Sequence, residues 1–224
     1  MSENQLHQKM AFLRSKVILM GLSVSLSLER IKSILDQNDE ELSRQILADE
    51  KNIDSLDNEI DELALEIMVR FQPVAYDLRF VVSVMRMILD LERIGDEISC
   101  IVSRLSANEL INHGDIADFC RPLLQKAFQM YSQAMESFSN NNPKLALQVL
   151  TENTACRGLE EELLSRIINF QLPLDLDQTT ANKKKMASVL ICHSLSRICQ
   201  RSANIAEHTV FISQGVSLKH GQPG

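Results

Sequence analysis

Residues 10–35 read MAFLRSKVILMGLSVSLSLERIKSIL, and this stretch decides the fold. Its apolar side chains return every three or four positions, which places them on one side of an α-helix. The stripe consists of Met10, Leu13, Val17, Met20, Val24, Leu28, Ile31 and Leu35. A helix of about 30 residues is therefore predicted at the start of the chain.

Two further stretches, residues 42–67 and 78–105, continue the same spacing. Gln72-Pro73 separates them, because the residue before a proline is disfavoured in a helix. Seven Gly and five Pro in 224 residues are too few for the many tight turns of a β-sandwich or β-barrel. Three long helices joined by short turns predict an antiparallel bundle.

The pattern then recurs about 103 residues later, so that Leu35 corresponds to Phe138 and Ile46 to Val149. An offset of 104 aligns Arg93 with Arg197. This internal duplication predicts an all-α fold of two tandem three-helix bundles related by a pseudo-twofold axis. The first repeat is assigned to residues 1–110 and the second to residues 111–217. Residues 218–224 are predicted to be a disordered tail.

The net charge of −7 is of the wrong sign for a nucleic-acid-binding protein. Five cysteines without a C-x-x-C pair are typical of free, mostly buried thiols in a reducing compartment. No apolar run reaches about 18 residues, so no membrane span is expected. Residues 17–28 resemble the apolar part of a signal peptide, but their helical period continues past Glu29.

Carboxylates form a stripe on each of two consecutive predicted helices. Residues 39–66 hold eleven acidic residues against two basic ones. Within this segment Glu50, Asp54 and Asp57 follow a helical step of four and three, and Asp61 continues it. On the next helix Glu92 and Asp96 interrupt the line Met85, Leu89 and Ser99, where the apolar period predicts core.

Like charges at helical spacing destabilise a helix, and carboxylates near a core cost more still. A cation bound between the two stripes would offset both costs, and oxygen ligands favour Mg, Mn, Fe or Ca. The alternative is a solvated acidic face, above all for Asp57, Glu59, Asp61 and Glu62.

The second copy lacks this set of acids. Its equivalents of Glu50, Asp54, Glu92 and Asp96 are Asn153, Arg157, Ser196 and Gln200. Loss of all four together is typical of a site lost as a unit. His193, equivalent to Leu89, is expected to lie in the core or half-buried.

The segments DEKNIDSLDNEID (49–61), FQPVAYDLRFV (71–81) and DLERIGDEI (90–98) resemble the PhoU family over nearly the whole chain. The resemblance implies a cytoplasmic all-α protein, often dimeric, that binds metal clusters. It also implies a regulator that links the phosphate ABC transporter to a sensor kinase and damps the phosphate-starvation response.

Carried over by position, Glu50, Asp54, Glu92 and Asp96 match the family's metal-binding motif, and Asp57 is an additional candidate ligand. The expected cofactor is one or more divalent or trivalent ions, iron or alternatively Mg, Mn or Zn. The resemblance predicts a homodimeric negative regulator of phosphate uptake with no catalytic residues and no nucleic-acid partner. Its expected partners are the transporter ATPase and a phosphate-sensing histidine kinase, through which alone it would meet the membrane.

Three alternatives remain open at the level of the sequence. The chain is a metal-free helical adaptor, a PhoU-like accessory of another transporter, or a di-metal helix-bundle enzyme. The enzyme is disfavoured because such sites use Glu-x-x-His pairs. None of the five histidines has Glu three residues before it.

Overall fold

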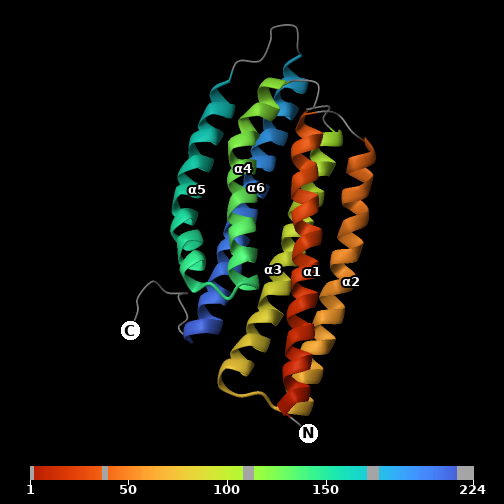
Figure 1. The fold of residues 1–224 in the computed structure, drawn as a ribbon. Helices are drawn as coiled ribbons and strands as arrows, with labels where there is room; N and C mark the ends of the chain where they lie inside the picture. Colours follow the sequence, from red (N-terminus) through yellow and green to blue (C-terminus); the bar gives the residue numbers. More distant parts are fainter. Residues whose placement is uncertain (1–2, 37–39, 108–113, 171–176, 216–224) are drawn as a thin grey trace.

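Six helices make up the computed structural model, which describes residues 3–36, 40–107, 114–170 and 177–215 (Figure 1). They are α1 (Glu3–Asp36), α2 (Glu40–Phe71), α3 (Ala75–Ala107), α4 (Gly114–Ser139), α5 (Pro143–Asn169) and α6 (Gln178–Gln214). No strand occurs in these four ranges, which confirms the all-α expectation. Helices α1, α2 and α3 pack on one another, and so do α4, α5 and α6. The predicted tail at 218–224 lies outside the described residues.

The helix ends follow from local sequence. Helix α2 ends at Phe71, and Gln72 adopts a positive φ of 48° before Pro73. Asn142 caps α5, whose first residue is proline, by accepting a hydrogen bond from the backbone N–H of Leu145 at 3.2 Å. Asp177 caps α6 by accepting from two backbone N–H groups at 3.0 Å. Gly215 ends α6 in the left-handed conformation that glycine tolerates best.

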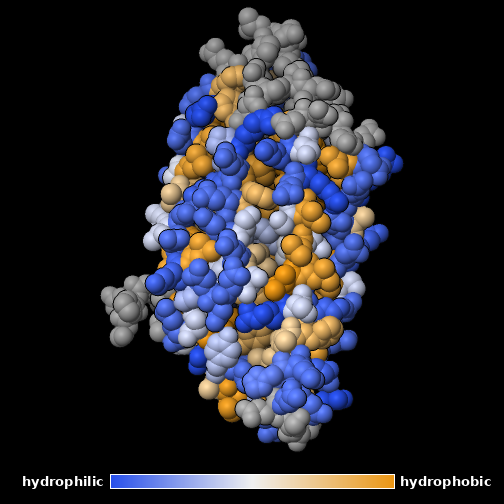
Figure 2. All heavy atoms as spheres, in the orientation of Figure 1, coloured by the Kyte–Doolittle hydropathy of each residue, from blue (hydrophilic) through white to orange (hydrophobic). Residues whose placement is uncertain are grey.

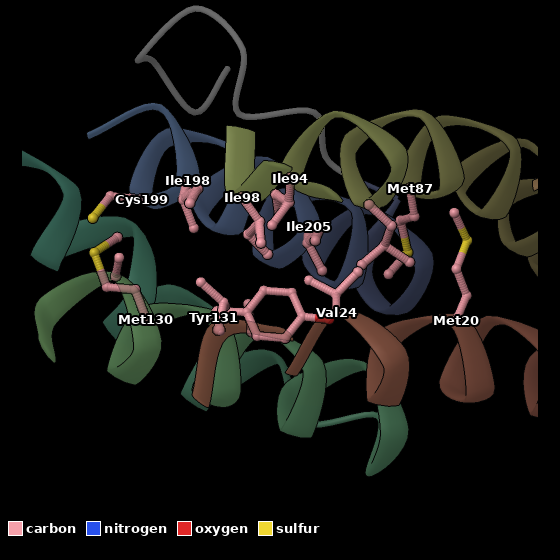
Figure 3. Close-up of a cluster of buried hydrophobic side chains, with 14 of the residues drawn as sticks. Met20, Val24, Met87, Ile94, Ile98, Met130, Tyr131, Ile198, Cys199 and Ile205 are labelled. Atoms are coloured by element: carbon pink, nitrogen blue, oxygen red, sulfur yellow. The ribbon is translucent and has the colours of Figure 1, made fainter. Parts of the chain in front are cut away.

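The third helix of each repeat lies at the centre of the molecule. In Figure 1, α3 and α6 run in opposite directions and pack against each other, and α1 also contacts α4. The core is therefore continuous across the two repeats. Figure 3 shows side chains of α1, α3, α4 and α6 meeting there, among them Val24, Ile94, Tyr131 and Ile205. The Tyr131 hydroxyl donates to the Gly21 carbonyl at 2.6 Å, which ties α4 to α1.

Helix α1 carries apolar residues on its outer side as well. Its inner stripe, from Met10 to Leu35, is buried as predicted. Apolar residues are also scattered among polar ones on the face of the molecule in Figure 2. The outer side of α1 exposes four large apolar side chains, those of Phe12, Leu19, Leu22 and Leu26. Because both sides are apolar, the stretch Asn4–Leu35 is long and apolar enough to cross a membrane by length and composition alone. The core helix of a soluble protein has the same length and composition, so these two properties alone do not make α1 a membrane span.

Candidate functional site

The two carboxylate stripes face each other along the contact between α2 and α3. Ser99 on α3 donates a hydrogen bond to Glu50 on α2 at 2.7 Å, which fixes the register of the two helices. Gly95 permits the close approach: a Cβ atom there would lie 3.3 Å from Cδ1 of Ile53. We call Glu50, Asp54, Asp57, Glu92 and Asp96 the acidic cluster.

The acidic cluster lies at the edge of the core and not inside it. Glu50, Asp57 and Glu92 are half-buried, and Asp54 and Asp96 are exposed. The expectation that Glu92 and Asp96 occupy core positions is therefore wrong. Their line borders the solvent, as the 52% exposure of Leu89 demonstrates, and the core stripe of α3 runs through its neighbours Ile88, Leu91, Ile94 and Ile98. The solvated reading holds for Glu59 and Glu62, which are exposed.

The carboxylates of the acidic cluster oppose one another's ionisation. Burial raises the pKa of Glu92, and the nearby Asp96 and Asp57 raise it further. Burial likewise raises the pKa of Asp96, with added contributions from Glu50 and Asp54 across the helix pair. Both residues thus respond to charges on α2, so the five acids form one electrostatic unit. Any cation placed among them would relieve this repulsion.

Asp57 is the most constrained of the five acids. Burial raises its pKa, and the neighbouring Asp61 and Asp54 add to the rise. Its Oδ1 atom is buried, and no hydrogen-bond partner for it lies among the described residues. A buried carboxylate oxygen without a donor is unfavourable unless a ligand satisfies it.

The chemistry of the acidic cluster fits a hard cation, since every candidate ligand atom in it is a carboxylate oxygen. The side chains do not converge on one point as they lie. Glu50 and Asp96 line a pocket of about 560 Å³ together with Ser99. Asp57 lines a neighbouring pocket of about 420 Å³. Within the described part of the chain, no group of three or more His, Cys, Asp or Glu side chains is close enough to hold an ion.

The second repeat has direct hydrogen bonds at the equivalent positions. Gln200, equivalent to Asp96, accepts from Asn153 at 3.3 Å and from Arg157 at 3.0 Å. Asn153 and Arg157 are the equivalents of Glu50 and Asp54. The same three positions thus meet in both repeats. In the second they complement one another, whereas in the first they are all acids.

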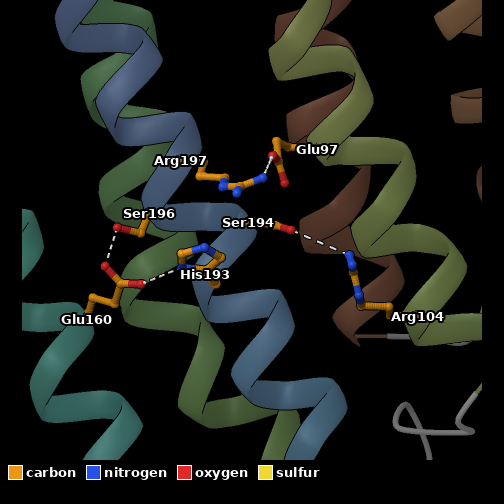
Figure 4. Close-up of polar contacts among 7 residues, drawn as sticks. All are labelled: Glu97, Arg104, Glu160, His193, Ser194, Ser196 and Arg197. Atoms are coloured by element: carbon orange, nitrogen blue, oxygen red, sulfur yellow. Dashed lines mark hydrogen bonds and ion pairs between the residues drawn. The ribbon is translucent and has the colours of Figure 1, made fainter.

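At the equivalents of Asp57 and Glu92 the second repeat keeps one acid and replaces the other with a serine. Their equivalents Glu160 and Ser196 are joined by a hydrogen bond in which the serine hydroxyl donates (Figure 4). His193 Nδ1 lies 3.2 Å from the same carboxylate. The expectation of a core or half-buried histidine is wrong, because the side chain of His193 is 56% exposed.

Sequence reasoning missed a second polar group, at the contact between α3 and α6. Asp90 is buried and accepts hydrogen bonds from Arg201 at 2.9 Å and from Asn204 at 3.1 Å. His208 Nε2 lies 3.7 Å from its other oxygen. We call these four residues the Asp90 cluster. The available signal was a lone carboxylate beside the buried stripe of α3, with polar residues at helical spacing on α6.

Comparison with known proteins identifies relatives that share this architecture. A family model described as the PhoU domain matches residues 17–105 and again residues 121–209, one match in each repeat. A curated relative from Pseudomonas aeruginosa, the "phosphate-specific transport system accessory protein PhoU homolog", is 26% identical over 96% of this chain and 88% of its own length. The Escherichia coli "phosphate-specific transport system accessory protein PhoU" is 22% identical, with the same shares covered.

Solved structures agree with the family model. The crystal structure of PhoU from Pseudomonas aeruginosa superimposes with a TM-score of 0.84 at 25% identity, over 94% of this chain and 99% of that one. The phosphate transport system regulatory protein PhoU from Streptococcus pneumoniae shares the fold, with a TM-score of 0.81 at 20% identity over 95% and 98% of the two chains. Because the family model covers most of both repeats, the protein belongs to the PhoU family.

Proposed function

We propose that the protein is a regulatory accessory protein of phosphate-specific transport. The single observation that carries this proposal is the match of the PhoU model to both repeats. Relatives that align with nearly the whole chain are described as accessory proteins of the phosphate-specific transport system. Family membership also agrees with the expectation that the protein is not an enzyme. It acts by binding.

The proposed partners are the ATPase subunit of the phosphate transporter and a phosphate-sensing histidine kinase. Docked to both as a cytoplasmic homodimer, the protein would lower phosphate uptake and damp the starvation response when phosphate is plentiful. The shared core of the two repeats supports this role, because a rigid scaffold can hold two partners at a fixed distance. The outer side of α1 offers apolar area for one of these contacts.

We further propose that the acidic cluster binds a divalent or trivalent cation. Glu50, Asp54, Asp57, Glu92 and Asp96 would hold it, and the buried free oxygen of Asp57 supports this assignment. The bound ion would supply positive charge that neutralises the facing carboxylates. The chain's own contribution is to hold α2 and α3 in register through the hydrogen bond from Ser99 to Glu50. Loss of the ion would loosen this helix pair and alter the surface offered to a partner.

Elemental analysis of protein purified without chelator tests the metal assignment. We expect the double variant Glu92→Ala, Asp96→Ala to lose the bound metal. The matched control, Glu62→Ala with Glu161→Ala, removes two exposed acids outside the cluster and should retain it. Wild-type protein without metal, or equal metal in both variants, would leave a metal-free helical adaptor as the better description.

Co-purification with the two partners tests the regulatory assignment separately. The tagged protein should retain the transporter ATPase and the kinase in extracts of phosphate-replete cells. Deletion of its gene should raise phosphate uptake in the same medium. If neither partner is retained under replete or starved conditions and uptake is unchanged, the chain serves another transporter.

A further inference from the structure

A pocket of about 330 Å³ lies at the contact between α3 and α6, where the two repeats meet. Its lining consists of Arg86, Leu89, Asp90 and Arg93 from α3 and Arg201, Asn204, Glu207 and His208 from α6. Three guanidinium groups face two carboxylates there, which leaves one net positive charge with the histidine neutral. The surrounding protein carries a net charge of −7, so this local excess of arginine stands out.

The Asp90 cluster forms the inner wall of this pocket and fixes its donors in place. Asp90 is only 5% exposed and accepts from both Arg201 and Asn204 through Oδ1. An arginine carries five N–H donors. The contact between Nη1 of Arg201 and Asp90 therefore leaves further donors for a ligand. A guanidinium held by a buried carboxylate is pre-organised and loses little freedom on binding.

The outer wall carries two further arginines, both on α3. Arg86 and Arg93 are both exposed. Neither makes an ion pair or a side-chain hydrogen bond with any other residue that the structure describes, although the positive charge of Arg93 partly offsets the rise that burial causes in the pKa of the nearby Glu92 and Asp96. They stand seven positions apart on α3, with Asp90 between them, and so share the side of the helix that faces α6.

The pseudo-twofold axis provides an internal comparison. The equivalents of Arg93 and Arg201 are Arg197 and Glu97, at an offset of 104. Those two residues form an ion pair at 2.9 Å (Figure 4). On that side of the axis, Glu97 therefore neutralises the charge of Arg197. On the pocket side the carboxylate position is occupied by Arg201, so that Arg93 and Arg201 line the same pocket together with Arg86.

We propose that this pocket binds a phosphate-class oxyanion, either inorganic phosphate or the phosphoryl group of a small metabolite. Arg86, Arg93 and Arg201 would contact its oxygens, because the planar guanidinium fork matches two oxygens of a phosphate. The volume is at the lower end of small-molecule sites and accommodates a compact anion. The site adjoins the acidic cluster, because Arg86 also lines the pocket that holds Asp57, but it has its own donors and does not depend on the proposed transport role. Because it joins α3 to α6, a bound anion stabilises the contact between the repeats.

Calorimetric titration of the purified full-length protein tests this proposal, after chelator treatment so that no ion in the acidic cluster can recruit phosphate. Inorganic phosphate and glucose 6-phosphate are titrated separately at matched ionic strength, with chloride as the blank. We expect binding and a higher melting temperature with at least one of them. The tighter of the two identifies the source of the phosphoryl group.

The matched variants are Arg93→Gln and Arg197→Gln, which remove the same charge on opposite sides of the pseudo-twofold axis. Loss of a charged hydrogen bond predicts affinity reduced by about tenfold for Arg93→Gln. Arg197→Gln should bind as the wild type does. Arg86→Gln, an exposed position, repeats the test should the first variant fail to fold. No binding of either phosphate, or an equal loss in both matched variants, would overturn the proposal.

Discussion

Asp90 on α3 and Arg201 on α6 form an ion pair between the two repeats, with 2.9 Å between Oδ1 and Nη1. The carboxylate is buried, and Asn204 and His208 complete its surroundings. This one acid therefore neutralises charge contributed by the other half of the chain. Its removal would leave the partly buried Arg201 guanidinium without its carboxylate partner.

Asp90→Ala should lower the free energy of unfolding by about 3 kcal/mol, the usual cost of breaking a buried ion pair from one side. Urea denaturation, monitored by circular dichroism, measures this change in the free energy of unfolding. Glu97→Ala is the control, because it breaks the pair with Arg197, whose side chain is 60% exposed. We expect the control to cost under about 1 kcal/mol. Equal costs would mean that Asp90 has no special role in joining the repeats.

Two groups of acids should respond to acid in opposite directions. Burial alone would raise the pKa of Asp90, but the nearby His208 and the hydrogen bonds from Asn204 and Arg201 outweigh it and leave the pKa below its ordinary value of 3.8. The stability contributed by Asp90 is therefore complete above 3.8 and is lost as the pH falls through its folded-state pKa. In Asp90→Asn the loss of stability below this pH should be shallower, as urea midpoints measured at several pH values would reveal.

Glu92 and Asp96 have the reverse sign, because their folded-state pKa values are raised. Their ionisation destabilises the fold, and this cost disappears as the pH falls through the raised values. In chelated protein at neutral pH, Glu92→Gln with Asp96→Asn should therefore increase stability by a few tenths of a kcal/mol. Added Mn²⁺ should raise the melting temperature of the wild type and leave that of the double variant unchanged, as measured by differential scanning calorimetry. A drop in stability of the chelated variant would contradict this account.

The second repeat should accept the acids of the first. The variant Asn153→Glu, Arg157→Asp, Ser196→Glu and Gln200→Asp recreates four positions of the acidic cluster between α5 and α6. It should be less stable than the wild type in chelator, because the hydrogen bonds to Gln200 are replaced by repulsion. Elemental analysis should find additional metal per chain. Metal content equal to that of the wild type would mean that the acids alone do not make the site.

The cysteines should differ sharply in reactivity. Cys100 is exposed and the other four are buried, with no disulfide. Sγ of Cys120 lies 3.6 Å from that of Cys192, and the hydrogen bond between them, together with burial, raises the pKa of Cys120. Titration of the native protein with a chromogenic aromatic disulfide should detect one rapidly reacting thiol. The remaining four should react only when the protein unfolds, and Cys100→Ser should abolish the fast phase.

The sequence was sufficient for the helices, the duplication and the pairing of α2 with α3, because these follow from periodic spacing. It was wrong about the burial of Glu92 and Asp96. Their stripe on α3 and the neighbouring core stripe have the same helical period, so spacing alone does not tell which of the two is buried. Leu89 lies at the edge of the core and is exposed. Its equivalent in the second repeat, His193, is exposed for the same reason. The Asp90 cluster escaped notice because Asp90 is more than 110 positions from the other members along the chain. Only the antiparallel contact of α3 with α6 brings them together.

The central position of α3 and α6 also bears on how the chain arose. A single three-helix ancestor pairing with its own copy through its third helix would have had two identical faces, with every acid present twice. Symmetry would have prevented one face from changing without the other. Fusion of two such copies into one chain would remove that restriction. Afterwards one half could keep its acids while the other replaced four of them with two amides, a serine and an arginine, and Arg201 could take a carboxylate position on just one side.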